Sequence, residues 1–563
     1  MSKVTRRTAL GLSLTSLVAG LSACATIPTK GEVNHYADPQ NTGTPVMADQ
    51  SISGPQPGAS PAEIIDGFIH AGVGARDDYK VAREYLTPEK AESWRPDGRT
   101  LVYNSAYSVT DRDGGNFTLT IPTNTVIDNR GLATSYTTVV DTDIDVKLTQ
   151  VDGEWRIAEV QDGTVLSRTE FTDIFNPYTL YFYDPTFTYA VPDVRWFAER
   201  TTVATSLIRV LLEGPASYLQ GAVVTAIPAD TRLSRNSVPI NNGTAEIQLT
   251  GGVALTTASA LALERLRTQL KQVLTSLPSV SEVELSINDQ AVDAQALENY
   301  REPAVNPPMP TYVVAIENNR LVTRNNFDDV GSQQTVVEVS PQARIVQPAM
   351  NYTQTFFAYS NDSRSEIWLA TSGGSRSIFR GEGILTSSFD HQNWLWVAER
   401  AGTVRAYPVG QDTGELREID TWLREETLHS LSVSRDGSRA LMVTSIGEAN
   451  YAAWVSAIRR DDEGAPTELL EPIRIGSDIN PQGAEWNSYQ EVFLWNVETS
   501  QTEIVSLSGV DTQYDSLQGI YRIVTGNGVD QALAMTSDGG LYIVAGRGWT
   551  RIESSLREVN YSG

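Results

Sequence analysis

The sequence of 563 residues has a single cysteine, Cys24, and only four histidines. One cysteine cannot form a disulfide within the chain. Basic residues are also scarce, since 43 lysines and arginines stand against 69 acidic residues and the formal net charge is −26. Phosphate backbones and anionic headgroups repel a body this acidic, so we expect no binding to nucleic acid. No apolar run, the N-terminal one included, reaches the roughly 20 residues that span a bilayer.

The residues before Cys24 indicate why the only cysteine lies there. A basic start with Lys3, Arg6 and Arg7 precedes an apolar run over residues 9–20, which is the pattern of a secretory signal peptide. The run leads into a motif that resembles the bacterial lipobox, formed by Leu21, Ser22, Ala23 and Cys24.

The lipobox resemblance implies a lipid anchor. Residues 1–23 are then a signal peptide that is removed, the sulfur of Cys24 carries a diacylglyceryl group, and the new N-terminus can take a further acyl chain such as palmitate. Several chains anchor firmly because each buried CH₂ contributes about 0.8 kcal/mol. An ordinary signal peptide with an incidental cysteine is the alternative, and Sec and twin-arginine export both stay open. We therefore expect a lipoprotein on the extracytoplasmic face of the cell membrane.

A tether and a first folded unit follow the anchor. Residues 24–60 are rich in Gly, Pro, Ser, Thr and Asn and predict a flexible tether. Over residues 61–185, helical spacing from Pro61 onward precedes alternating strands at residues 116–121 and 140–148. This order resembles the NTF2-like α+β class, whose cone-shaped sheet can enclose a ligand.

Three aspartates in the second of these strands, Asp141, Asp143 and Asp145, have a spacing that also occurs in calcium loops. Val146 stands where an EF-hand loop needs glycine. Apolar residues alternate with the aspartates, so the pattern favours a strand with its carboxylates on the outer face.

A more specific series of motifs covers residues 186–295. A helix over residues 198–212 ends in Leu-Leu-Glu-Gly-Pro, and an Ala-Ile-Pro segment, a strand, a long helix over residues 258–277 and a closing strand follow. The order resembles the GerMN domain of sporulation and germination proteins, and this resemblance implies binding or assembly near membranes. Gly214 and Pro215 also have a simpler explanation as a helix stop.

The C-terminal half predicts a different architecture. Residues 296–310 form a proline-rich linker, and residues 311–563 contain short β segments with Asp-Gly or Gly-Gly turns. They recur on the order of every 40–50 residues, the period of propeller blades. We expect a degenerate β-propeller of five to seven blades, with a β-sandwich as the alternative. The most blade-like motif is SRDGSRAL at residues 434–441.

The order of these parts resembles the LpqB family of actinobacterial lipoproteins over essentially the full length. The resemblance implies a multi-domain α+β and all-β protein that binds the extracellular sensor domain of the MtrB histidine kinase. Through this partner it would modulate the MtrAB two-component system in cell-envelope homeostasis and division. Composition and spacing alone indicate only a lipid-anchored, multi-domain binding protein.

The sequence shows no motif for catalysis. We find no G-x-S-x-G elbow, P-loop or dinucleotide fingerprint, and His35, His70, His391 and His429 have no metal-ligand spacing. We therefore expect no enzyme, no metal and no cofactor, and we interpret His70 as a partly buried packing residue.

A rival function is a sensor that binds a cell-wall glycan in the propeller funnel or in the cone. Trp394, Trp486 and Trp549 at loop ends could stack on sugars, although large aromatics also commonly fill propeller sheets.

Overall fold

The computed structural model describes residues 52–293, 297–325, 334–337, 344–410, 414–447, 449–476, 479–552 and 554–563. The predicted signal peptide, lipobox and lipidation site, including Cys24, lie outside these residues. Residues Ile52–Gly563 form one compact unit. Among the described helices, none combines the length and the apolar character needed to cross a bilayer.

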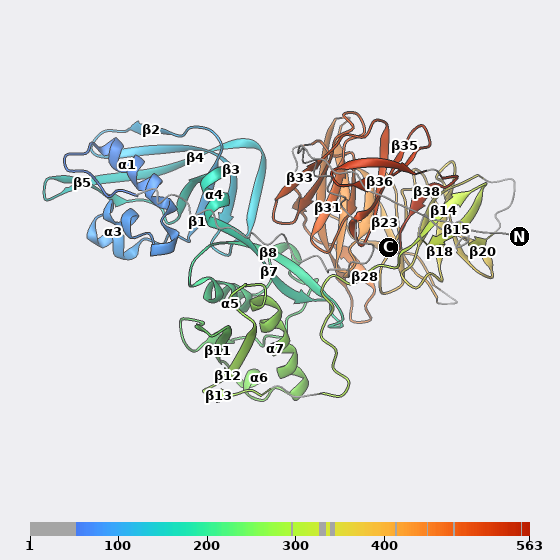
Figure 1. Cartoon of the computed structure of the whole chain (residues 1–563), viewed down its shortest axis with the longest axis horizontal. Helices are drawn as coiled ribbons and strands as arrows, with labels where there is room; N and C mark the ends of the chain where they lie inside the picture. The colour runs from blue at the N-terminus through green and yellow to red at the C-terminus, as the bar shows by residue number, and fades with distance from the viewer. Residues whose placement is uncertain are drawn as a thin grey trace, which may run out of the picture. The chain divides into compact units, whose positions relative to one another are not determined.

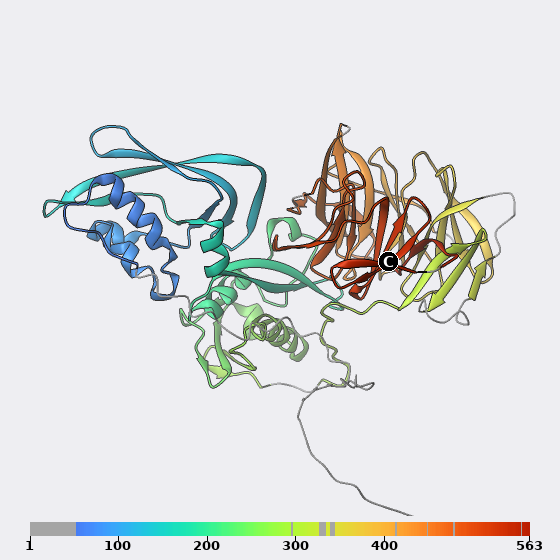
Figure 2. The same ribbon diagram turned by 45° about the horizontal axis from the view of Figure 1, so that its top comes forward.

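The N-terminal domain consists of helices followed by a curved sheet. Its elements are α1 (Pro61–His70), η1 (Ala71–Val73), η2 (Ala75–Asp77), α2 (Lys80–Glu84), α3 (Pro88–Ser93), β1 (Arg99–Tyr103), β2 (Ser108–Asp111), β3 (Asn116–Asp128), β4 (Ala133–Val151), β5 (Glu154–Glu159), β6 (Thr164–Ser167) and α4 (Arg168–Ile174). Ser60 and Glu63 form a capping box that starts α1. The strand order is β5-β4-β3-β1-β6, and α1 and α3 lie against the long curved strands (Figures 1 and 2). The predicted α+β order is confirmed.

Strand β4 confirms the strand interpretation of the three aspartates. Asp143 accepts a hydrogen bond of 2.6 Å from Thr120 on β3, on the solvent side of the sheet. Ile144, Val146 and Leu148 are buried on the opposite side. A cavity of about 30 Å³ remains between α1 and the sheet, and its lining is largely apolar.

The middle domain begins with a hairpin, β7 (Phe175–Tyr183) and β8 (Ala190–Ala198), whose strands pair along their whole length. The predicted boundary between residues 185 and 186 falls in the turn of this hairpin. The predicted helices and strands follow in the expected order. They are α5 (Val203–Glu213), η3 (Ser217–Leu219), β9 (Arg232–Leu233), β10 (Ile240–Asn241), β11 (Thr244–Thr250), α6 (Val253–Thr256), α7 (Ala260–Leu274), β12 (Glu282–Ile287) and β13 (Gln290–Ala291).

Within the described residues, the C-terminal domain consists of six further sheets. The first contains β14 (Tyr312–Glu317), β15 (Arg320–Asn325), β16 (Gln334–Val337) and β38 (Arg557–Asn560); the second β17 (Ile345–Met350), β18 (Phe357–Asn361), β19 (Glu366–Thr371) and β20 (Gly374–Arg380); the third β21 (Ser388–Phe389), β22 (Trp394–Ala398), β23 (Val404–Pro408) and β24 (Arg417–Ile419). The fourth contains β25 (Thr427–Val433), β26 (Arg439–Ile446), β27 (Asn450–Arg460), β28 (Pro466–Leu469) and β29 (Ile473–Arg474); the fifth β30 (Gly483–Trp486), β31 (Glu491–Trp495), β32 (Thr502–Ser506) and β33 (Asp511–Tyr514); the sixth β34 (Ile520–Gly526), β35 (Gly528–Thr536), β36 (Leu541–Ala545) and β37 (Gly548–Ile552).

These sheets are propeller blades. Strands β17, β21, β25, β30, β34 and β38 contact one another in turn and close a ring. The ring is completed by the chain itself, because β38 pairs with β14 and so supplies the innermost strand of the first blade. Figure 1 shows the red β38 beside the yellow-green β14. The described residues thus give six blades, and the alternative of a β-sandwich was wrong.

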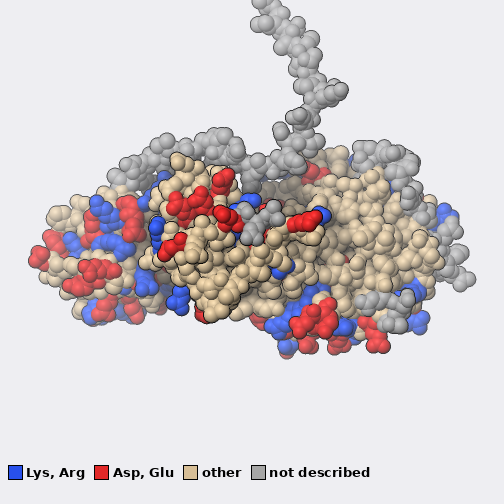
Figure 3. Space-filling model, turned by 90° about the horizontal axis from the view of Figure 1, so that it is seen from below, with Lys and Arg blue, Asp and Glu red and all other residues tan. Residues whose placement is uncertain are grey.

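The surface carries charges of both signs. On the face shown in Figure 3, acidic and basic side chains lie in mixed groups and no continuous basic field is visible.

Candidate functional site at the centre of the propeller

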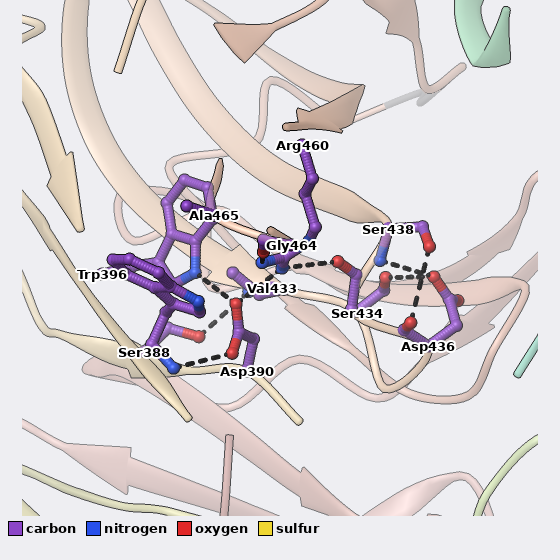
Figure 4. A network of polar contacts seen from close by, with 12 residues as sticks. Ser388, Asp390, Trp396, Val433, Ser434, Asp436, Ser438, Arg460, Gly464 and Ala465 are labelled. Atoms are coloured by element: carbon purple, nitrogen blue, oxygen red, sulfur yellow. Dashed lines mark hydrogen bonds and ion pairs between the residues drawn. The ribbon is translucent and has the colours of Figure 1, made fainter. Parts of the chain in front are cut away.

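The turn predicted to be the most blade-like holds a buried ion pair. Asp436 lies between β25 and β26, and its Oδ1 accepts hydrogen bonds of 2.9 Å from both the Ser434 hydroxyl and the Ser438 amide. Its other oxygen pairs with the guanidinium of Arg439, which also donates to the Tyr489 carbonyl at 2.7 Å. Both charged side chains are fully buried. Figure 4 shows how Ser434 and Ser438 converge on the carboxylate of Asp436.

A second buried ion pair, between Asp390 and Arg460, connects this turn to the third blade. Asp390 accepts from the Trp394 amide at 2.8 Å and from the indole of Trp396 at 3.0 Å, and it pairs with Arg460 at 2.6 Å (Figure 4). Arg460 also donates to the Gly437 carbonyl at 3.0 Å. Buried charges are tolerated when they are paired and hydrogen-bonded, as Asp390 and Arg460 are, although Nε and Nη1 of Arg439 have no hydrogen-bond partner among the described residues. The network therefore fixes the third and fourth blades against each other.

Arg435, next to Asp436, reaches into other blades. It is 3% exposed and donates to the Asn487 carbonyl at 3.0 Å, to the Gly526 carbonyl and to the Asn306 side chain at 3.3 Å. Burial lowers the pKa of its guanidinium. One arginine thus joins the linker to the turns of the fifth and sixth blades.

The described histidines do not converge on a catalytic centre. His391 stacks on Tyr352 with ring centroids 3.6 Å apart and lies 4.8 Å from the ring of Tyr189. Its burial lowers its pKa to about 4. His429 contacts the Ser445 hydroxyl at 2.8 Å. The interpretation of His70 as partly buried was wrong, because its side chain is 62% exposed at the C-terminal end of α1.

A third buried ion pair lies at the base of the middle domain. On β8, two nitrogens of Arg195 bind the two carboxylate oxygens of Asp193 at 2.6 and 2.8 Å. The Ala216 amide donates to the same carboxylate at 2.8 Å, and Arg195 donates to the Arg130 carbonyl at 3.1 Å. Beside it, Tyr218 belongs to an apolar cluster shared with β26 and β27. The pair therefore anchors the segment after Leu-Leu-Glu-Gly-Pro where it meets the propeller.

The inner strands of the blades surround a channel of about 220 Å³. Glu485 on β30 faces it, and burial raises the pKa of this carboxyl while Arg522 opposes that shift. Within the described part of the chain, no three His, Cys, Asp or Glu side chains are grouped as metal ligands. The propeller channel thus presents both hydrogen-bonding and charged side chains to a ligand.

The tryptophans of the glycan hypothesis lie mostly in the blades. Trp394 and Trp486 are buried. The indole of Trp486 donates to the Ser432 carbonyl at 3.2 Å, and that of Trp549 donates to the Asp515 carbonyl at 3.0 Å. Burial assigns Trp394 to blade packing, whereas Trp486 is buried and also lines the propeller channel.

Comparison with protein families matches the three folded domains in order. Residues 54–172 match the N-terminal domain of lipoprotein LpqB, residues 179–293 match the Germane domain described as sporulation and spore germination, and residues 319–558 match the LpqB β-propeller domain. The chain belongs to the LpqB family. The resemblance in the sequence is confirmed, and so is the multi-domain fold class.

Curated LpqB lipoproteins match the chain at low identity. The protein of Thermobifida fusca is 27% identical over 52% of this chain and 48% of its own length, and that of Nocardia farcinica is 28% identical over 47% and 44%. The chain thus matches about half the length of these relatives. The protein of Mycolicibacterium smegmatis is 22% identical over 98% of this chain and 96% of its own length.

Solved structures show only a distant likeness. A chain of a nidogen/laminin complex has a TM-score of 0.34 and 13% identity over 45% of this chain and 98% of its own length. A catalytically inactive form of the virginiamycin B lyase of Staphylococcus aureus has a TM-score of 0.30 and 11% identity over 42% of this chain and 77% of its own length.

The sequence patterns did not predict the buried ion pairs of the propeller and of the middle domain. The SRDGSRAL motif contains Asp436 and Arg439, but the turn pattern explained both without an ion pair. The Asp-x-Arg spacing on β8 was a further signal, because residues two apart on a strand share a face.

Proposed function

We propose that this lipoprotein is anchored by lipid on Cys24 at the extracytoplasmic face of the cell membrane and binds the extracellular sensor domain of the MtrB histidine kinase. In this proposal it modulates two-component signalling in cell-envelope homeostasis and division, and it does so by binding rather than by catalysis. The observation that carries the proposal is the order of the three family matches, which follows that of LpqB lipoproteins.

The contacts between the middle domain and the propeller support a binding role. Thr179 on β7 donates to Gln490 at 3.1 Å, and the Tyr181 and Tyr489 hydroxyls lie 3.4 Å apart. The indole of Trp196 on β8 donates to the Ser508 carbonyl at 3.0 Å. A domain held at several points suits a protein that presents a fixed surface to a partner, since less ordering is then required on binding.

The helices of the middle domain offer apolar groups to such a partner. Val253 on α6 is 76% exposed and Leu261 on α7 is 41% exposed. Exposed apolar side chains on a folded surface are candidates for protein contacts, although single ones are also common elsewhere. In our proposal the kinase contacts this domain, and since Val139 (50% exposed) and Ile446 (62% exposed) lie on the other two domains, the substitutions below decide between the three.

The first experiment is a pull-down of the kinase ectodomain by residues 25–563, which retain the compact unit from Ile52 onward. Deleting residues 186–295 would cut the β7–β8 hairpin, so point substitutions are the better probe. We expect the combined Val253→Asp and Leu261→Glu variant to lose binding. Val510→Asp, at a propeller residue that is 51% exposed, is the matched control and should bind normally.

Two outcomes would change the proposal. Normal binding by the Val253 and Leu261 variant would place the contact on another surface. No binding by folded wild-type protein would remove the kinase as partner and favour the cell-wall glycan. Membrane attachment is tested separately, because Cys24→Ser should move the protein from the membrane to the soluble fraction.

A further inference from the structure

The propeller channel has a lining unlike that of an apolar core. All six blades contribute polar side chains to it, namely Gln347, Ser388, Ser430, Glu485, Thr525 and Asn560. Its volume of about 220 Å³ is below the ≈300–1,000 Å³ of pockets for drug-sized ligands. A molecule of monosaccharide size is therefore the appropriate occupant.

The charge of this lining is opposite to that of the whole chain. Among the described lining residues, four are arginines and two are glutamates: Arg364, Arg400, Arg435, Arg522, Glu485 and Glu558. Arg364 and Arg400 lie in the second-to-third strand loops of neighbouring blades, and Arg522 lies on β34. Arg364 and Arg400 are exposed, Arg522 is half-buried and acts on the carboxyl of Glu485, and none of the three lies within ion-pair distance of an acidic side chain among the described residues. In a chain of net charge −26, this is a local site for an anion.

Several buried polar atoms in the lining lack a partner within the described residues. The hydroxyls of Ser387 and Ser562, on residues 4% and 3% exposed, make no hydrogen bond, and neither does Nε of Arg435. All three residues line the channel. Buried polar groups are nearly always paired in folded proteins, so such atoms around one cavity indicate groups that a ligand can pair.

We propose that the propeller channel binds a small acidic sugar. Its carboxylate or phosphate pairs with the unpaired arginines, and its hydroxyl groups bond to the serine hydroxyls and to Glu485. A neutral apolar molecule does not fit this lining, because it would leave the buried hydroxyls of Ser387 and Ser562 and Nε of Arg435 without partners. The site is independent of the kinase proposal, since it can be measured on this protein alone.

The test is calorimetric titration of residues 25–563 with four probes: glucuronate, glucose 1-phosphate, glucose and inorganic phosphate. We expect one or both acidic sugars to bind, more weakly as salt is added. Glucose and inorganic phosphate should bind about tenfold or more weakly, because each lacks half of the contacts. The stronger of the two sugars shows whether the anionic group is a carboxylate or a phosphate. The proposal is overturned if neither acidic sugar binds, or if inorganic phosphate binds as tightly as the stronger of the two acidic sugars, which would mean an adventitious ion only.

Variants separate a binding role from a structural one. Arg522→Gln should weaken binding about tenfold, the loss expected for a hydrogen bond to a charged group. Arg551→Gln, at an exposed position on β37, is the matched control and should bind as wild type does. Ser387→Ala removes an unpaired buried hydroxyl, so it should weaken binding while thermal stability stays equal or rises. Unchanged affinity in both Arg522→Gln and Ser387→Ala would refute the channel as the site.

Discussion

The N-terminal domain and the propeller use charged residues in opposite ways. In the N-terminal sheet the charges lie outside, as in the exposed pair of Lys147 and Glu159 at 2.6 Å, and the inside is apolar. In the propeller Asp390 and Asp436 are buried together with their arginines. The cavities follow the same division, since the one under the first sheet is small and largely apolar and the propeller channel is larger and polar. The interior of the sheet domain is thus apolar, whereas that of the propeller also contains paired charges.

The largest expected effect comes from breaking a buried pair. Asp436→Ala leaves Arg439 buried without its partner and should destabilise the propeller by about 3–5 kcal/mol. Urea denaturation followed by tryptophan fluorescence measures this loss. The control is Asp538→Ala in the exposed turn before β36, where the carboxylate bonds only to Thr536 and Gly540, and its effect should be much smaller. Equal losses in the two variants would show that burial of the pair is unimportant.

A substitution that creates a cavity tests the apolar packing of the N-terminal domain. Ile157 on β5 is fully buried, and Ile157→Ala should cost about 2–5 kcal/mol through lost contacts and the space left behind. The transition of the N-terminal domain should shift while binding of the channel probes does not. Val140→Ala, at a β4 side chain that is 42% exposed, is the control and should stay within about 0.5 kcal/mol of wild type.

The buried side chain of His391 makes the stability of the propeller depend on pH. The neutral form of His391 is favoured in the fold, because burial lowers its pKa from 6.5 to about 4. The unfolded chain then binds more protons between these values, so stability is full above pH 6.5 and falls as the pH drops toward 4. The loss is at most about 3 kcal/mol, at 1.36 kcal/mol per pH unit.

The measurement is urea denaturation across this pH range. His391→Phe keeps the stack on Tyr352 and should flatten the dependence, whereas His70→Gln at an exposed site should not. A wild-type profile that is flat between pH 4 and 6.5 would contradict the assignment. Asp390, Asp436 and Arg435 are the charges that also act on this imidazole.

The smallest effect is expected at the exposed pair of the N-terminal sheet. Lys147→Met should cost no more than about 1 kcal/mol, because solvent and salt screen the interaction with Glu159. A double-mutant cycle with Glu159→Gln gives the pair energy directly. A coupling comparable to that of Asp436 and Arg439 would remove the contrast between the two domains.

The same contrast explains how far the sequence predicts the structure. Alternation located β4 and placed Ile144 inside and Asp143 outside, because in that sheet polarity and exposure coincide. Helix periodicity and the Leu-Leu-Glu-Gly-Pro stop located the end of α5, but the predicted start at residue 198 was wrong, because Ala198 is the last residue of β8 and α5 begins at Val203. The blade motif located the turn at Asp436, but a pattern of polarity cannot distinguish a solvated aspartate from one that is buried beside an arginine. The channel residues come from six separate blades, so no local spacing relates Glu485 to Arg522. The lipidation site at Cys24 stays a prediction, since it lies outside the described residues.

The pairing of β38 with β14 also bears on how the protein is made. Strand β14 begins at residue 312 and β38 at residue 557, so the first blade cannot be completed until a strand is made that follows its neighbours by more than 200 residues. Contacts so distant in sequence form slowly. During that interval the earlier blades are an open arc with an uncovered edge, a state in which strands pair readily with other chains. Completion of the chain and closure of the ring are therefore coupled, and chaperones have this interval in which to act.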